Sequence, residues 1–239
     1  NKRSREMYDN NDDNFSELPE LENNSFGATL FYKPTDNQKL EFSFSNLNEY
    51  RYGGEMVETA AHLAQQSEER THNVLMGNLD YQLNFNNNNS SFIAYIAAQN
   101  TDREHYTGIF PDEPEEINTF LENPPYGFSD NSTWQAGVQL NHNLKNFLGG
   151  NNELTLGTEY LTDDVLDFIE AYNYEIDQTT KNLGVFVQSD WEVNQKLSVL
   201  SGLRVDQHNF VDNPIVSPRF SFLYKVLPNT QLRASWGTG

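Results

Sequence analysis

The chain has 239 residues, of which 36% are hydrophobic and 13% aromatic, no cysteine, and a formal net charge of −20. The missing cysteines exclude disulfides and thiolate metal sites, and no apolar run reaches the ~18 residues that a transmembrane helix needs. The aromatic content argues against a disordered chain, and the acidic balance disfavours nucleic acid as a partner.

Alternation of apolar and polar residues is the main structural signal. It predicts strands, because successive side chains of a strand point to opposite faces. After a polar, aperiodic start at 1–24, we expect ten strands, in chain order: 25–33, 39–46, 71–85, 91–100, 133–144, 153–162, 181–193, 197–210, 217–226 and 231–237. The fourth of these contains the run FIAYIAA, which is apolar on both faces, so its register stays open.

The connections between these strands alternate in length. Short turns are expected near residues 36, 88, 148, 195 and 228. Longer connections are expected at 48–70, 102–130, 163–178 and 209–216. The first could hold a short helix at 56–66, and prolines should keep much of the second irregular. Strict alternation of short and long connections is typical of outer-membrane barrels.

Negative charge is concentrated in four windows, which together carry the whole net charge: 1–24, 48–70, 102–130 and 163–178. The remaining strands and turns are neutral in sum. A charge that faces lipid at mid-membrane costs ~2–4 kcal/mol, whereas loops in water carry charge freely. An ordinary solvated surface also carries such acidic runs, so the windows alone identify no site.

The clearest strands lie in 181–226. The first of them places Val185 and Val187 on one face and Gln188 and Asp190 on the other. These segments run to ten residues or more, whereas strands of soluble domains usually have ~5–6. Long strands with one apolar and one charged face fit a transmembrane β-barrel whose polar face lines the lumen. Charged residues expected on that lumen face, where they pair with one another, are Glu159, Arg204, Asp206, Arg219 and Arg233.

Residues 181–239 resemble the barrel of TonB-dependent outer-membrane receptors. Pro218-Arg219 matches a recurrent strand feature of that family, and the final Trp236-Gly237-Thr238-Gly239 matches the start of a second one. Over 1–180 the likeness is mostly one of pattern. The asparagine-rich turns and acidic loops resemble the receptors of Bacteroidetes.

The resemblance implies an all-β, antiparallel, up-and-down barrel of ~22 strands in the bacterial outer membrane, of which this chain holds about ten. It also implies a plug domain, contacts with lipid and lipopolysaccharide, and import of a scarce ligand with energy from the TonB complex. Iron–siderophores, haem, cobalamin and oligosaccharides are the ligand classes of the family. We expect residues 1–239 to be one partial barrel domain without the plug and without the barrel's C-terminal strand.

Aromatic residues in the long connections are the candidate ligand contacts, because tyrosine and phenylalanine at exposed loops suit flat ligands. The candidates are Tyr50, Tyr52, His105, Tyr106, Phe110, Tyr126, Tyr172 and Tyr174. Packing within the loops, or an aromatic girdle at the membrane interface, explains the same residues without a ligand. A loop histidine could bind haem iron, but no haem-receptor motif surrounds His62 or His105.

We predict no catalytic residue, no resident cofactor and no metal site. The acidic runs around Asp112 and Asp163 lack the spacing of a known calcium loop. The main alternative is a self-contained ten-stranded outer-membrane enzyme such as a surface protease, with Asp206 and His208 as a thin candidate pair. A soluble β-sandwich or carbohydrate-binding module is a weaker third possibility.

Overall fold

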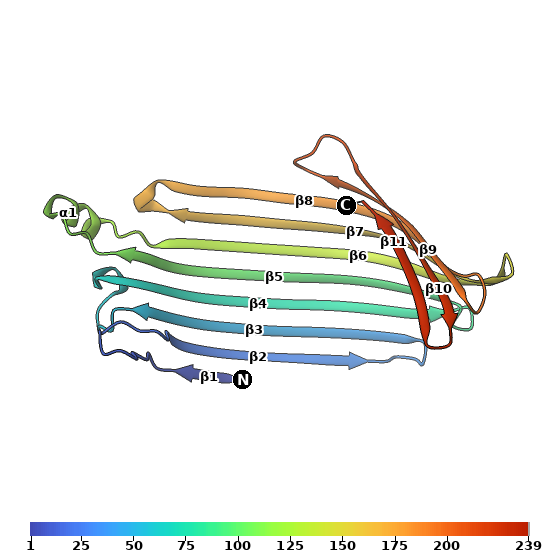
Figure 1. Cartoon of the computed structure of the whole chain (residues 1–239), viewed down its shortest axis with the longest axis horizontal. Coiled ribbons are helices and arrows are strands. Elements are labelled where there is room, and N and C mark those ends of the chain that lie inside the picture. The colour runs from blue at the N-terminus through green and yellow to red at the C-terminus, as the bar shows by residue number, and fades with distance from the viewer. Residues whose placement is uncertain (239) are drawn as a thin grey trace.

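A single antiparallel sheet makes up almost all of the computed structural model, which describes residues 1–238 (Figure 1). Its eleven strands follow one another in sequence order. They are β1 (Lys2–Arg5), β2 (Glu20–Tyr32), β3 (Gln38–Gly54), β4 (Gln66–Phe85), β5 (Ser90–Ile109), β6 (Gly127–Phe147), β7 (Gly150–Ile169), β8 (Tyr174–Glu192), β9 (Leu197–His208), β10 (Ile215–Leu227) and β11 (Thr230–Gly237). This order confirms the predicted up-and-down meander.

The sheet has one apolar and one polar face, because residues directly opposite in a sheet share a face. Phe42 lies opposite Leu79, which lies opposite Ile96, and all three belong to what we call the outer face. Val185 and Val187 lie on the same face as Leu156 of β7, as predicted. These outer side chains remain exposed, so in this sheet nothing covers them.

The inner face carries the polar residues. Asp80 lies opposite Tyr95, Tyr95 opposite Gly137, and Gly137 opposite Glu159. The pairing settles the register that the sequence left open: Ile96 of β5 lies on the outer face and Tyr95 on the inner one. The sheet is strongly curved, since β9, β10 and β11 cross the view obliquely over the others (Figure 1).

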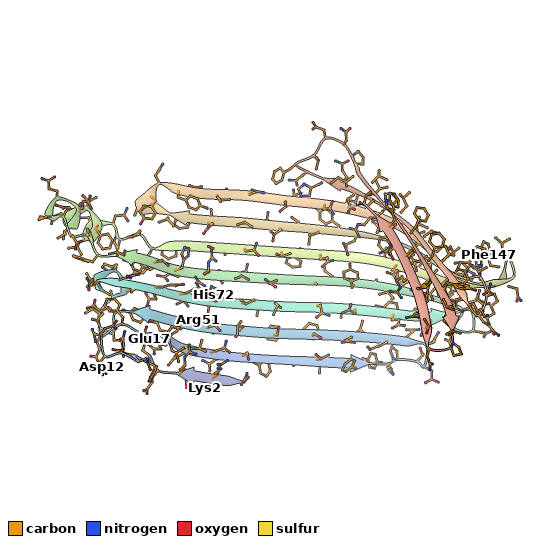
Figure 2. All side chains as sticks on the ribbon, in the orientation of Figure 1. Lys2, Asp12, Glu17, Arg51, His72 and Phe147 are labelled. Carbon is orange, nitrogen blue, oxygen red and sulfur yellow. The ribbon has the colours of Figure 1, made fainter. Side chains whose placement is uncertain are left out.

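All short turns lie at one end of the strands and all long connections at the other, which we call the rim. Phe147 marks the turn end, whereas Arg51 and His72 lie near the rim (Figure 2). The four acidic windows all reach the rim. Negative charge therefore gathers at a single end of the sheet, as the charge pattern predicted.

The predicted long loops were wrong in extent, because the strands continue through most of them. Residues 48–54 and 66–70 belong to β3 and β4, and β7 and β8 fill 163–178 except for the 3-10 turn η2 (Glu170–Tyr172) and Asn173. In these extensions the outer face is no longer continuously apolar, since on β4 it carries Glu69 and Thr71, so the alternation that marks the predicted strands is weak there. On β4 the apolar part of the outer face runs from Leu75 to Phe85, which matches the ~9–11 residues of a membrane-crossing strand.

Three further expectations need correction. The helix expected at 56–66 shrinks to the 3-10 turn η1 (Ala61–Leu63). The segment in which prolines should prevent regular structure holds α1 (Pro114–Glu122), because Pro114 stands in the first helical turn, where its missing N–H costs nothing. The structure has one strand more than the ten predicted: β1 pairs through its backbone with Leu21–Asn24 of β2, in a region expected to be loop.

The C-terminal motif falls at the end of the described residues. Trp236, Gly237 and Thr238 of the recognised motif are described, and Gly239 lies outside the described residues. Over residues 1–238, no helix has the length and apolar content needed to cross a membrane.

Candidate functional site

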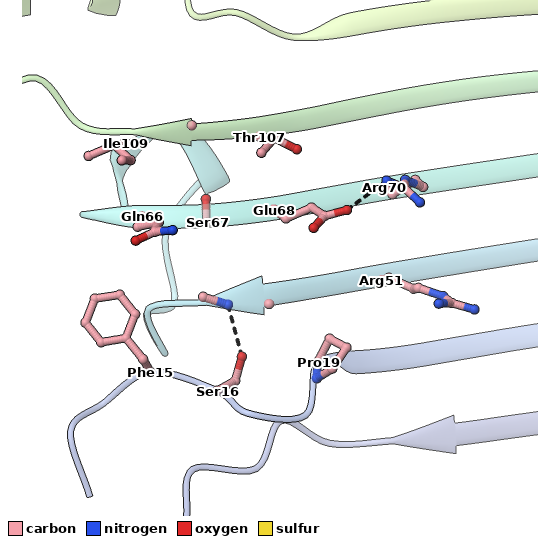
Figure 3. Close-up of a pocket in the computed structure, with 13 residues that line it drawn as sticks. Phe15, Ser16, Pro19, Arg51, Gln66, Ser67, Glu68, Arg70, Thr107 and Ile109 are labelled. Carbon is pink, nitrogen blue, oxygen red and sulfur yellow. Dashed lines mark hydrogen bonds and ion pairs between the residues drawn. The ribbon is translucent and has the colours of Figure 1, made fainter. Parts of the chain in front are cut away.

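A cavity of about 840 Å³ lies on the inner face at the rim (Figure 3). Its walls come from the ends of β3, β4 and β5 and from the N-terminal segment around Phe15. Gly54 donates its N–H to the Ser16 hydroxyl (3.0 Å) and accepts the Ser16 N–H at its carbonyl (2.9 Å), which fixes that segment against β3. Ligand pockets commonly measure ~300–1,000 Å³, so the cavity has a suitable size.

Five basic residues lie beside this cavity on the inner face, and we call them the arginine–histidine patch: Arg51, Arg70, His72, Arg103 and His105. The strand register brings them together, because Arg51 lies opposite Arg70 and Arg70 opposite His105. In the next inner-facing row, His72 lies opposite Arg103. A chain with net charge −20 therefore collects three of its arginines at one place.

Each arginine of the patch has one carboxylate partner. Nitrogen–oxygen distances are 2.7 Å for Arg51–Glu49, 2.8 Å for Arg70–Glu68 and 3.8 Å for Arg103–Asp167. Arg103 also donates to the Ser129 hydroxyl at 2.8 Å. The pairings hold the guanidinium groups in place but use few of the five N–H donors that each arginine has.

Several patch nitrogens have no hydrogen-bond partner. They are Arg70 Nε, His72 Nε2, Arg103 Nε and His105 Nδ1, all covered by neighbouring atoms and all without a partner within residues 1–238. Buried polar groups are normally satisfied, so four such nitrogens on two neighbouring strands mark this patch as exceptional.

Both patch histidines have lowered pKa values. Burial lowers the pKa of His72, helped by Arg70 and Arg103 and opposed by Glu49. Burial also lowers the pKa of His105, again helped by Arg103 and Arg70 and opposed by Asp167. The outer face at this level carries Thr71 and other polar residues, so the patch lies beyond the apolar band of the outer face.

This lowering predicts a pH-dependent rim. The two histidines bind protons more weakly in the folded rim than in the unfolded chain. The stability that depends on their neutral form is therefore fully present above the ordinary histidine pKa of ~6.5, and it is lost as pH falls through their pKa values in the folded protein. We expect amide hydrogen exchange in 70–73 and 102–105, corrected for intrinsic rates, to accelerate between about pH 7 and about pH 5. A His72→Gln/His105→Gln variant should show a flat profile. An identical profile in both proteins would contradict this assignment.

The predicted aromatic contacts divide between two places. Tyr52 and Tyr106 lie on the outer face, buried to 4% and 0% exposure beneath η1 and the connection that holds α1. The Tyr126 ring packs 5.1 Å from that of Tyr106, and Tyr126 shares a hydrogen bond of 3.1 Å with His62. We call Tyr52, Tyr106, Tyr126, His62 and Phe120 the rim aromatic cluster. Its members pack the connections onto the wall.

The other candidate contacts lie elsewhere. Tyr50 donates from the outer face to Glu69 (2.9 Å), and Phe110 packs edge-on against Phe120 at 5.6 Å. Tyr172 and Tyr174 are exposed at the tip between β7 and β8. His105 belongs to the arginine–histidine patch. Of the eight candidates, Tyr172 and Tyr174 are thus exposed at the rim, and the half-buried His105 lies on the inner face beside the cavity.

Three of the five predicted lumen residues, Glu159, Arg204 and Asp206, pair with one another on the inner face. Glu159 accepts from the Tyr95 hydroxyl (2.5 Å) and the Gln135 amide (2.9 Å), and it lies 3.3 Å from Arg204. Arg204 also donates to Asp206 at 2.8 Å. Arg219 contacts Gln188, and Arg233 lies on the edge strand β11, where it is exposed.

Gly137 makes this inner network possible. The Tyr95 ring lies over Gly137 on its way to Glu159, and a Cβ at Gly137 would overlap the ring. We expect Gly137→Val to displace Tyr95 and to lower the free energy of unfolding by about 1–3 kcal/mol, as overpacking does. Denaturant titration of the purified protein measures this. Gly77→Val, where a Cβ would meet only ordinary contacts, is the matched control, and an equal loss there would refute the packing explanation.

Asp206 and His208 do not form a catalytic pair. The Asp206 carboxylate accepts from Arg204 and from Asn182 (2.8 Å), while His208 Nδ1 accepts the Phe210 N–H (3.2 Å). Within residues 1–238, no group of three or more histidines and carboxylates is arranged to hold a metal ion.

Sequence reasoning missed Arg51, Arg70, His72 and Arg103. The three arginines stand in segments expected to be loops, and His72 stands near the start of the predicted strand 71–85. Only the cross-strand register unites the four residues. The available signal was weak: arginine recurs in three acidic windows that otherwise hold few bases.

The sequence and the fold are both similar to those of known proteins. A family model described as "TonB dependent receptor-like, beta-barrel" matches residues 8–239. Among solved structures, the siderophore receptor PirA from Pseudomonas aeruginosa is similar at 12% identity and TM-score 0.68, over 90% of this chain and 33% of that one. The outer membrane transporter YddB from Escherichia coli is similar at 10% identity and TM-score 0.68, over 92% and 32%.

A mutant of the ferric enterobactin receptor from Pseudomonas aeruginosa is similar at 16% identity and TM-score 0.69, over 96% of this chain and 34% of that one. The chain thus spans about one third of the length of these structures, and at such identities the likeness concerns the fold. No curated protein matches the sequence.

Proposed function

The chain belongs to the β-barrel family of TonB-dependent receptors, and on this premise we propose that it forms part of the wall of an outer-membrane receptor that imports a scarce extracellular ligand. The eleven strands would supply about half of a barrel of ~22 strands. The outer face contacts lipid, the inner face lines the lumen, and the rim faces the cell exterior.

The rim cavity is the observation that carries this proposal. It opens on the polar inner face, at the end where the long connections and the acidic charge gather. A ligand that arrives from outside meets this cavity before it reaches the hydrogen-bonded side chains around Glu159, which lie further down the inner face. Binding at the outer mouth of the lumen is the first step that an importer requires.

An iron–siderophore is the ligand class that we propose. The similar structures are named as a siderophore receptor and a ferric enterobactin receptor, and another is named as the receptor for alcaligin. His105 at the patch and Tyr172 and Tyr174 at the rim are proposed contacts. Energy for import would come from the TonB complex, and the bilayer and lipopolysaccharide would surround the outer face. We propose no catalytic activity.

Iron uptake by the parent bacterium tests this function. We expect deletion of the gene to abolish uptake of radiolabelled iron from at least one ferric siderophore under iron limitation, and a plasmid copy to restore it. Collapse of the proton-motive force should stop uptake without stopping binding. Wild-type uptake from every siderophore tested, together with lost growth on cobalamin, haem or a glycan, would reject the siderophore class but not the receptor.

A further inference from the structure

Arg51 and Arg70 stand directly opposite each other on neighbouring strands beside the rim cavity. Like charges in such positions destabilise a sheet. Arg103 in the next row adds a third positive charge to the same patch. Arg5 of β1 extends the row of Arg51 and Arg70, because it lies opposite Leu21, which in turn lies opposite Arg51. Packing alone gives no reason for such a gathering of positive charge.

Most of the N–H donors of Arg51 and Arg70 make no hydrogen bond within residues 1–238. Arg51 donates only through Nε, to Glu49, and its side chain is 52% exposed. Arg70 donates only through one Nη, to Glu68. Glu68 is 55% exposed and approaches Arg70 from within the same strand, so another carboxylate or phenolate could take its place. Guanidinium groups with free forks are the donors that bind oxyanions bidentately.

The cavity also has an apolar side. Phe15, Pro19 and Ile109 line it opposite the two arginines, and Ser16, Gln66 and Thr107 add hydrogen-bonding groups (Figure 3). Ile109 is 65% exposed although it faces this cavity. The walls therefore offer positive charge at one side and an apolar surface at the other.

We propose that this cavity binds a ligand that carries clustered anionic oxygens on an apolar or aromatic body, with Arg51 and Arg70 as its principal contacts. The proposal rests on the proposed receptor function and specifies its ligand. It excludes neutral ligands such as cobalamin, uncharged oligosaccharides and neutral iron hydroxamates. Glu68 acts as an internal competitor that the ligand displaces from Arg70.

Equilibrium binding to the full-length receptor in outer-membrane vesicles tests the proposal. The probes are ferric enterobactin, an aromatic anion; inorganic pyrophosphate, an anion without an apolar body; and ferrichrome, a neutral ferric hydroxamate. We expect ferric enterobactin to bind, pyrophosphate to compete with it weakly, and ferrichrome not to bind. An Arg51→Gln/Arg70→Gln variant should bind ferric enterobactin at least about tenfold more weakly.

Glu68→Gln supplies a sharper readout, because removal of the competing carboxylate should tighten binding severalfold, whereas mere damage to the rim would weaken it. Lys2→Gln/Lys33→Gln removes two positive charges from exposed positions outside the inner face of the rim and is the matched control, with binding unchanged. Binding of ferrichrome alone, binding of none of the three probes, or equal anion affinity in the arginine variant would overturn the inference. A negative result in these binding experiments would not change the uptake phenotype of the deletion strain, so the failure of this inference can be distinguished from the failure of the proposed function.

Discussion

Replacement of Ala94 by arginine is expected to prevent assembly of the barrel in the outer membrane, whereas the same replacement at Ala97 is expected to be tolerated. Both alanines lie on β5, but Ala94 is opposite Tyr81 and Val138 on the outer face. That level is the middle of the apolar part of the face. An arginine there costs ~2–4 kcal/mol against lipid.

Ala97 is the matched control because it lies on the inner face, where a recess of about 710 Å³ is lined by small polar residues such as Thr29 and Ser43. The recess has room for a longer, charged side chain that contacts water. Heat-modifiable mobility on gels and protease resistance of intact cells measure assembly. Failure of Ala97→Arg alone would show that the two faces have been assigned in reverse. Equal assembly of both variants would show that Ala94 does not face lipid.

The faces could be predicted from the sequence because the bilayer acts on each outer residue separately. Every second position must be apolar wherever a strand crosses lipid, so Val185 and Val187 identify their face without knowledge of their neighbours. The run FIAYIAA failed this test because alanine and isoleucine are acceptable on both faces. Its register follows only from pairing with β4 and β6, which places Ile96 beside Leu79 and Ala136.

The strand extensions could not be predicted for the opposite reason. Above the bilayer the outer face need not be apolar, so the run from Gln66 to Arg70 has no periodic constraint and reads as a polar loop. Its conformation depends on backbone pairing with β3 and β5, to which many sequences are equally suited. The predicted loops were therefore too long, and the aromatic residues in them were placed too far from the wall.

The arginine–histidine patch shows the same limit at the level of the site. Arg51, Arg70 and His105 are distant in sequence and share a row only because three strands pair in one register. The inner network was more predictable, since Glu159, Arg204 and Asp206 stand at alternate positions of well-marked strands. Charges on a lumen face need partners, and this requirement alone indicated that they would pair.

Truncation of Tyr106 is expected to release the rim connections from the wall. Tyr106 is fully buried, at 0% exposure, between Tyr126 and the backbone around Ala61. Burial, helped by the nearby Tyr126, raises its pKa to about 12, so the ring enters the cluster uncharged. Tyr106→Ala should reduce the free energy of local unfolding by about 3 kcal/mol or more, because a large aromatic side chain is lost without collapse of its site.

Tyr106→Phe distinguishes packing from hydrogen bonding, because the Tyr106 hydroxyl is buried without a partner among residues 1–238. Removal of an unsatisfied buried hydroxyl is neutral or stabilising, so the phenylalanine variant should match or exceed the native protein. Hydrogen exchange in 55–65 and 110–126 measures both variants. Faster exchange in the alanine variant alone would establish that the ring itself fastens η1 and α1 to the wall, and equal acceleration in both would mean that the hydroxyl has an acceptor in the receptor. The rim aromatic cluster lies on the outer face and the cavity on the inner one, so the Tyr106 ring does not contact a ligand in the cavity. Any loss of ferric enterobactin binding in the alanine variant should therefore match the loss of strand pairing at the ends of β3, β4 and β5.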